Sequence, residues 1–229
     1  MKSKPVSKLS TLPHDVVDLT AAYVRSKLQG DASGHDWWHA YRVWKGAVYI
    51  GTRENVDLLT VQLAALLHDI ADWKLHKGDT RIGCRTAKKW LIKCGVEEGV
   101  VTHVCAIIST ISFKGAGVSS YVDSMEGKVV QDADRLDALG AIGIGRAFAY
   151  GGHMGRIMYD PNRKPQLHAT AEQYLSSDGP TINHFYEKLL LLKDLMNTPT
   201  AKRMAQSRHD FMKVFLERFE REWTWKDVE

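Results

Sequence analysis

A histidine and an aspartate stand side by side at the end of an apolar segment, LAALLHDIAD. They are His68 and Asp69. A buried carboxylate beside an imidazole is energetically costly unless both groups are paired or bind a metal ion. On a helix, neighbouring side chains point about 100° apart, so this pair could occupy two positions around one ion. Taken alone, such a dipeptide is more often a hydrogen-bonded pair at a helix end, so a metal site needs further ligands.

Two other stretches carry candidate ligands. His39 lies in HDWWHAYRVW, and Arg42 follows three residues later on the same helical face. The apolar stretch VVQDADRLDALGAIG carries three acids, Asp132, Asp134 and Asp137, and spacing alone does not choose between them. Asp137 lies one turn after Asp134 and shares its face. Two imidazoles and two carboxylates, with room for water, suit a six-coordinate Mn²⁺, Fe²⁺, Ni²⁺ or Mg²⁺ ion better than a structural Zn²⁺ ion.

The combined order His…His-Asp…Asp resembles the HD-domain superfamily of metal-dependent phosphohydrolases. The similarity extends from about residue 20 to about residue 220. The stretches GHDWWHAYRVW, LAALLHDIADWK, GD at 78–79, and DADRLDALGAIGIGRAFAYGG resemble a branch of small stand-alone proteins that look like nucleotide pyrophosphohydrolases. This resemblance implies that one divalent metal ion is held by His39, His68, Asp69 and Asp134. The sequence lacks the extra histidines that build a second metal site in the HD phosphodiesterases.

The same resemblance suggests a catalytic acid or base. Asp72 is our candidate, because relatives such as the 5′-deoxynucleotidases carry a catalytic Glu three residues after the HD aspartate. The alternative is that Asp72 orients His68. Asp137 and Asp79 are candidates for carboxylates that support the metal ligands from behind. Cations near the site could bind substrate phosphates, although each, taken singly, is more often a surface charge; the candidates are Arg42, Lys74, Lys114, Arg156, His184 and Lys188.

Helical periodicity predicts the elements that must position these side chains. The segment VDLLTVQLAALLHDIAD is apolar nearly all round, which is typical of a central, buried helix. No stretch shows the period-two alternation of a strand. We therefore predict an all-α fold in one domain. Its predicted divisions are a flexible N-terminus at 1–12 and an HD domain at 13–225, with the HD core at about 34–150 and closing helices at about 180–223.

Composition narrows the class of protein. The 229 residues include 44% hydrophobic and 25% charged residues, the ordinary balance of a globular protein with a real core. The net charge of +4 suits an anionic substrate but is too diffuse to indicate nucleic acid. Three cysteines, an odd number, fit neither a disulfide framework nor a zinc knuckle. Since no apolar run is long enough for a signal peptide or a membrane helix, we expect a soluble, cytoplasmic protein.

The leading functional hypothesis is hydrolysis of nucleoside or deoxynucleoside triphosphates to monophosphate and pyrophosphate. One alternative is a 5′-nucleotidase or general phosphomonoesterase, which would use the same metal chemistry with a different pocket. A second is a non-catalytic HD module that binds a nucleotide and signals through a partner. The expected ligand is a small phosphorylated molecule, with no membrane or nucleic-acid partner. The segment 151–180, rich in Gly, Pro, Asn and Ser, is predicted to be a long surface loop, either a lid or a contact in a homodimer.

Overall fold

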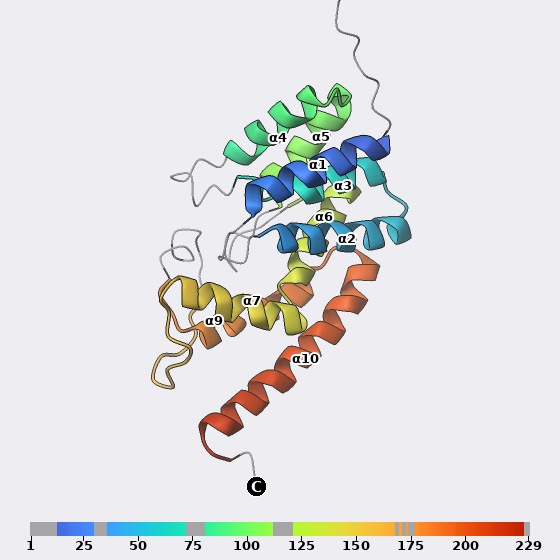
Figure 1. The fold of residues 1–229 in the computed structure, drawn as a ribbon. Coiled ribbons are helices and arrows are strands. Elements are labelled where there is room, and N and C mark those ends of the chain that lie inside the picture. Colours follow the sequence, from blue (N-terminus) through green and yellow to red (C-terminus); the bar gives the residue numbers. More distant parts are fainter. Residues whose placement is uncertain are drawn as a thin grey trace, which may run out of the picture.

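The computed structural model describes residues 13–29, 36–71, 81–111, 121–167, 170, 173 and 177–226. Within these residues the chain is helical and contains no strand, which confirms the all-α prediction (Figure 1). The elements are α1 (Pro13–Leu28), α2 (Trp37–Glu54), α3 (Leu58–Leu67), α4 (Ile82–Lys93), α5 (Glu98–Thr110), α6 (Met125–Asp137), α7 (Gly140–His153), α9 (Thr181–Glu187), the 3₁₀ helix η2 (Leu189–Leu195) and α10 (Pro199–Trp223). No helix among the described residues has the length and hydropathy needed to cross a membrane.

The short helix α3 lies at the centre of the fold and packs against α1, α2, α5 and α6. Seven of its ten residues are buried, as its uniformly apolar sequence predicts. Asp57 caps its first turn by accepting hydrogen bonds from the backbone N–H groups of Leu59 and Thr60. The helix is shorter than expected, because it ends at Leu67 and residues 68–71 form a turn. His68 and Asp69 therefore lie in the turn after the helix and not within it.

Helices α2 and α6 pack against α3 and against each other. Asp36 caps α2 by accepting a hydrogen bond from the backbone N–H of His39. Residues at helical spacing along α2, including His39, Val43 and Ala47, are fully buried. Ser124 caps α6 in the same way, by accepting from the N–H of Gly127. These contacts bring one face of each of three helices to a common point, where the candidate metal ligands lie.

The remaining helices form two groups at opposite ends of this centre (Figure 1). Helices α4 and α5 form a hairpin that turns at Gly95, whose φ of 74° favours glycine. Helices α7 and α9 lie at the other end, together with η2 and the long helix α10, whose C-terminal half packs on α7 and α9 through Phe215. Helix α6 ends at Asp137, and α7 begins at Gly140, whose φ of 70° lets the chain turn between the two helices. After residue 180 the chain forms α9 and then η2 before α10 begins.

Candidate metal centre

Two imidazole rings face each other between α2 and the turn after α3. His39 and His68 place their Nε2 atoms 3.2 Å apart, and both residues are buried. His39 Nδ1 lies 2.8 Å from Asp137 Oδ2, and His68 Nδ1 lies 2.8 Å from the Ala65 carbonyl oxygen. Because a carboxylate and a carbonyl only accept hydrogen bonds, each Nδ1 is the nitrogen that donates. In the neutral rings each Nε2 then carries a lone pair, and both lone pairs point into the same space.

Two carboxylates approach this space from different elements. Asp69 Oδ2, in the turn after α3, lies 3.3 Å from His39 Nε2 and 3.4 Å from His68 Nε2. Asp134 Oδ1, on α6, lies 3.5 Å and 3.8 Å from the same two nitrogens. The ligand atoms of His39, His68 and Asp134 all lie within 4.8 Å of one another. The two carboxylates are 20% and 31% exposed, so the cluster is open to solvent on their side.

The electrostatics of the cluster favour a cation. Burial alone would lower the pKa of His68, but the charges of Asp69 and Asp134 outweigh it and raise the pKa to about 9. In the absence of another cation, a proton on His68 therefore offsets the negative potential. A divalent metal ion would serve the same purpose with four donor atoms already gathered. Two imidazole nitrogens and two carboxylate oxygens are a donor set that suits Mn²⁺, Fe²⁺, Ni²⁺ or Mg²⁺, so the residues present fit the predicted metal.

Asp137 supports the cluster from behind. Its carboxylate accepts a hydrogen bond from His39 Nδ1 and two from Arg42, through Nε at 2.7 Å and Nη2 at 3.0 Å. Arg146 Nη1, from α7, lies 3.1 Å from the same carboxylate. Burial opposes ionisation, but the hydrogen bonds from His39 and Arg42 and the charge of Arg146 hold the pKa of Asp137 well below its usual range. The ionised Asp137 therefore fixes the ring of His39 with Nε2 directed into the cluster.

Asp132, the third acid of α6, has a different surrounding. Its Oδ1 accepts hydrogen bonds from the backbone N–H and the side-chain amide of Asn197. Its Oδ2 accepts from the backbone N–H and hydroxyl of Thr198, the cap of α10. Asp132 is fully buried and anchors the start of α10 to α6. The choice that spacing left open thus has a geometric basis, since Asp134 faces the imidazoles and Asp132 faces α10.

Among the predicted substrate-binding residues that the structure describes, Arg42 contacts this group of side chains directly, through Asp137. Arg156 Nη2 donates to the Ser177 carbonyl oxygen at 2.6 Å. His184 is half-buried on α9, and Lys188 directly follows that helix. The role of these three residues in substrate binding stays a prediction. Four other candidates lie outside the described residues; they are Asp72, Lys74, Asp79 and Lys114.

Arg146 is a residue that the sequence analysis missed. It lies in α7 within GIGRAFAY, and its guanidinium reaches Asp137 on α6, with the side chain 20% exposed. The break at Gly140 turns α7 back, and this turn brings Arg146 to the centre. Nothing in the local spacing signals that contact. An arginine inside an otherwise apolar, glycine-rich helix was the available hint, because an unpaired guanidinium is costly to bury.

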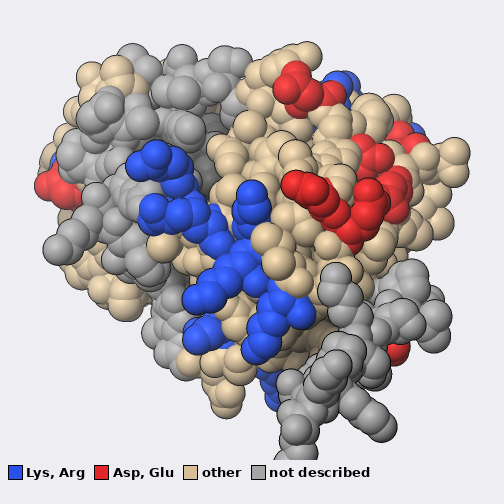
Figure 2. Space-filling model, turned by 90° about the horizontal axis from the view of Figure 1, so that it is seen from above, with Lys and Arg blue, Asp and Glu red and all other residues tan. Residues whose placement is uncertain are grey.

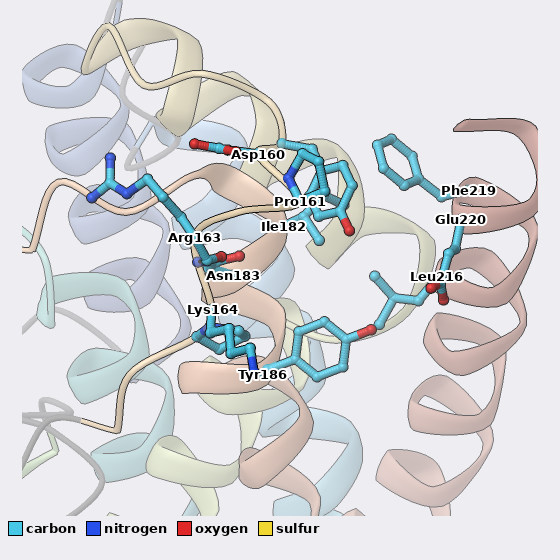
Figure 3. A pocket seen from close by; sticks show the side chains of 12 residues that line it. Asp160, Pro161, Arg163, Lys164, Ile182, Asn183, Tyr186, Leu216, Phe219 and Glu220 are labelled. Carbon is cyan, nitrogen blue, oxygen red and sulfur yellow. Dashed lines mark hydrogen bonds between the residues drawn. The ribbon is translucent and has the colours of Figure 1, made fainter. Parts of the chain in front are cut away.

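A separate pocket of about 180 Å³ lies between α9, α10 and the segment that precedes α9 (Figure 3). Tyr186 from α9 and Phe219 and Glu220 from α10 line it, together with Arg163 and Lys164. None of the predicted site residues lines this pocket. Its charged groups are of both signs, so it offers no concentrated charge for a phosphate. The metal cluster is therefore the better candidate for the reaction centre.

Comparison with known proteins identifies the family. The sequence pattern of the HD domain matches residues 37–139, which contain the whole cluster. A crystal structure from Lactobacillus plantarum is 41% identical and covers 91% of this chain and 96% of its own, with a TM-score of 0.81. An HD-superfamily hydrolase from Bacillus thuringiensis is 43% identical and covers 93% and 99%, with a TM-score of 0.72. YpgQ from Bacillus subtilis, solved in complex with ADP, is 39% identical and covers 90% and 97%, with a TM-score of 0.71.

These similarities extend over nearly the whole length of this chain and of each related protein. The sequence identities are high enough to place the chain in the same family. The HD family implies the use of a divalent metal ion, and the cluster of His39, His68 and Asp134 could hold one. Together, the sequence pattern, the related hydrolase and the cluster lead to one conclusion. The chain belongs to the HD-domain family and is a metal-dependent phosphohydrolase.

Proposed function

We propose that this chain hydrolyses nucleoside and deoxynucleoside triphosphates to monophosphates and pyrophosphate. The metal ion in this proposal is held by His39, His68, Asp69 and Asp134, and Mn²⁺ is the first candidate. The observation that carries the proposal is the convergence of two imidazole nitrogens and two carboxylate oxygens in a space open on one side. The ADP bound to YpgQ of Bacillus subtilis, a relative of similar length, supports a nucleotide as substrate.

A divalent ion at this position would neutralise charge on the phosphoryl oxygens and acidify a water molecule for attack. The protein's own groups must orient the ligands and balance charge. Asp137 holds His39 in one tautomer, and Arg42 and Arg146 stand beside Asp137 as positive charges near the cluster. We propose that Arg42, whose side chain is 32% exposed, also attracts the substrate phosphates from this position.

The release of pyrophosphate requires cleavage of the anhydride bond between the α- and β-phosphates. Water supplies the new oxygen on the monophosphate, and its proton must be removed as the bond forms. We propose that Asp72 takes this proton, and that Asp79 supports the site. Cationic side chains would then hold the phosphates of the substrate. The proposed phosphate-binding residues, besides Arg42, are Lys74, Lys114, Arg156, His184 and Lys188.

The test is an assay of metal-stripped protein with a panel of ribo- and deoxyribonucleoside triphosphates, with and without added Mn²⁺. Orthophosphate is measured in parallel reactions with and without inorganic pyrophosphatase. We expect orthophosphate only when both Mn²⁺ and pyrophosphatase are present, together with nucleoside monophosphate on an ion-exchange column. Orthophosphate in the absence of pyrophosphatase would contradict the proposal and favour a nucleotidase or phosphomonoesterase.

Matched variants connect this activity to the cluster. Asp134→Asn should lower the rate at least 100-fold, because it removes one anionic ligand (removing one group that acts in the transition state typically changes rates by about 10²–10³-fold). Asp123→Asn changes an exposed carboxylate just ahead of the same helix and should leave the rate unchanged. If Asp134→Asn keeps its Mn²⁺-dependent activity, the proposed ligand set is wrong. The third outcome is that the parent protein shows another Mn²⁺-dependent phosphohydrolase activity, without release of pyrophosphate, and that Asp134→Asn loses it. In that case the substrate assignment is wrong and the metal site stands.

A further inference from the structure

Helix α4 carries a row of exposed basic side chains along one face. The helix and its N-cap residue, Arg81, contain five Lys or Arg residues and no Asp or Glu. All five are exposed, and their spacing of four, three, one and four residues keeps them within one side of the helix; they are Arg81, Arg85, Lys88, Lys89 and Lys93. The opposite side is formed by Gly83, Ala87 and Leu91, which are buried. The basic row follows the axis of α4 for about 18 Å, given a rise of about 1.5 Å per residue.

A stacked aromatic pair attaches the basic end of α1 to this row. Tyr23 of α1 and Trp90 of α4 stack with their ring centroids 3.9 Å apart and their planes 4° from parallel. Lys27 Nζ lies 5.9 Å from the centroid of the Tyr23 ring, and Lys93 Nζ lies 6.0 Å from that of Trp90. The two ammonium groups therefore border one aromatic pair. Arg25 is also exposed on this last turn of α1. We call the five residues of α4 together with Arg25 and Lys27 the α4 basic face.

Much of this charge is not neutralised by neighbouring acids. Within the part of the chain that the structure describes, no Asp or Glu oxygen lies within 4.0 Å of the amino groups of Lys88, Lys89 or Lys93. The same holds for Arg25 and Lys27 of α1. The view from above, onto the side where α1, α4 and α5 lie, shows Lys and Arg side chains gathered together and Asp and Glu side chains to one side of them (Figure 2). The positive charge of this face therefore lies together and is separated from the acidic side chains seen in the same view.

We propose that the α4 basic face binds the phosphate backbone of double-stranded nucleic acid, independently of base sequence. Duplex DNA carries one negative charge per about 1.7 Å of its axis when both strands are counted, so the stretch of duplex beside an 18 Å row carries roughly ten phosphate charges. Tyr23 and Trp90 stack on each other and so do not offer free rings for unpaired bases. This arrangement favours a duplex over a single strand, for which exposed stacking platforms supply much of the affinity.

The same face is poorly suited to a membrane surface. Amphipathic helices that lie on membranes present a broad apolar side as well as basic residues. The exposed part of α4 offers one large apolar residue, Ile92, at 58% exposure, and its other apolar residues face the protein. A basic surface without a broad apolar side is typical of contacts to nucleic-acid backbones. An anionic vesicle is therefore the comparison probe in the experiment below.

The experiment is fluorescence anisotropy with a labelled 20-base-pair DNA duplex and the full-length protein at 50 to 200 mM salt. If four cations contact phosphates, log K should fall with log salt at a slope of about −3.6, and affinity should drop roughly 100-fold across this range. Lys88→Glu/Lys89→Glu should lose at least tenfold in affinity at 50 mM salt and reduce the slope by about 1.8. The matched control, Lys202→Glu/Lys213→Glu, makes the same change in net charge at exposed positions of α10 and should bind as the parent does.

Each result bears on the proposal. Absence of duplex binding at 50 mM salt overturns it, as does an equal loss of affinity in both double variants, which would reflect net charge alone. Binding to vesicles containing phosphatidylglycerol but not to the duplex overturns it in favour of a membrane. The double variant Arg25→Glu/Lys27→Glu tests the α1 part independently and should also weaken duplex binding. All these side chains are exposed, so unchanged circular dichroism and phosphohydrolase activity are the expected checks of folding.

Discussion

Replacing Asp137 with Asn tests how the metal cluster is held in place. In the structure, the Asp137 carboxylate accepts a hydrogen bond from His39 Nδ1 at 2.8 Å and is bound bidentately by Arg42. Asn has the same shape and keeps one acceptor oxygen, but it removes the charge. The His39 hydrogen bond then becomes a neutral one, which is roughly half as strong as its charge-assisted form. The ring of His39 is held less firmly, and its Nε2 becomes a weaker ligand.

The expected magnitude follows from this loss. Groups that orient metal ligands typically change metal affinity by about 10- to 100-fold when they are mutated, which corresponds to about 1.4–2.7 kcal/mol. Stability should fall as well, because Arg42 and Arg146 lose their shared partner. Breaking a fully buried ion pair is destabilising by about 3–5 kcal/mol. Since the two arginine side chains are 32% and 20% exposed, we expect a smaller loss, of roughly 2 kcal/mol.

Calorimetric titration of metal-stripped protein with Mn²⁺ measures the metal affinity. Urea unfolding without metal measures the stability. Asp132→Asn is the matched control, because Asp132 is equally buried on the same helix but hydrogen-bonds to Asn197 and Thr198. It should lower stability and leave Mn²⁺ affinity unchanged. If Asp137→Asn binds Mn²⁺ as tightly as the parent, or if Asp132→Asn weakens Mn²⁺ binding equally, Asp137 does not act through His39.

Three further predictions concern the metal and the helices. Mn²⁺ at about 1,000 times its dissociation constant should stabilise the protein by about 4.1 kcal/mol, and a thermal-shift assay should find no such gain in His68→Ala. Gly143→Ala should destabilise the protein by about 1–3 kcal/mol in thermal unfolding, since the new Cβ would lie 2.2 Å from the Ala138 carbonyl oxygen. Gly145→Ala should stabilise it by about 0.5–1 kcal/mol, because no atom lies within 4 Å of the new Cβ. Asp57→Ala should cost about 1 kcal/mol and Asp57→Asn much less, because Asn keeps the cap of α3; equal losses in urea unfolding would contradict the capping role.

Much of the fold could be predicted from local pattern. The apolar character of residues 58–67 indicated a buried central helix, and α3 is that helix. The boundaries of α1 and α10 also follow from capping and periodicity, with Pro13 at the first helical position and Thr198 as a cap. Local pattern could not locate the end of α3, because the apolar run continues through Ile70 while the chain already turns at His68.

The different roles of the three acids of α6 depend on contacts with residues that are far away in the sequence. Asp132 is bound by Thr198, which lies 66 residues later, and Asp137 is bound by Arg42, which lies 95 residues earlier. Helical spacing places Asp134 and Asp137 on one face but contains no information about which segment packs there. The contact of Arg146 with Asp137 likewise exists only because α7 turns back after Gly140. Long-range packing, and not local propensity, therefore assigns the separate roles.

The charges gathered at the centre also bear on the order of binding in the proposed reaction. Three carboxylates, those of Asp69, Asp134 and Asp137, stand against two guanidiniums, those of Arg42 and Arg146. Without metal, the raised pKa of His68 keeps its ring protonated, so these charges sum to zero and the group does not attract a polyphosphate strongly. A divalent ion would displace this proton and bring the sum to +1, because it adds two positive charges where the imidazole nitrogens converge. We therefore expect metal binding to precede tight binding of the proposed nucleotide at this site.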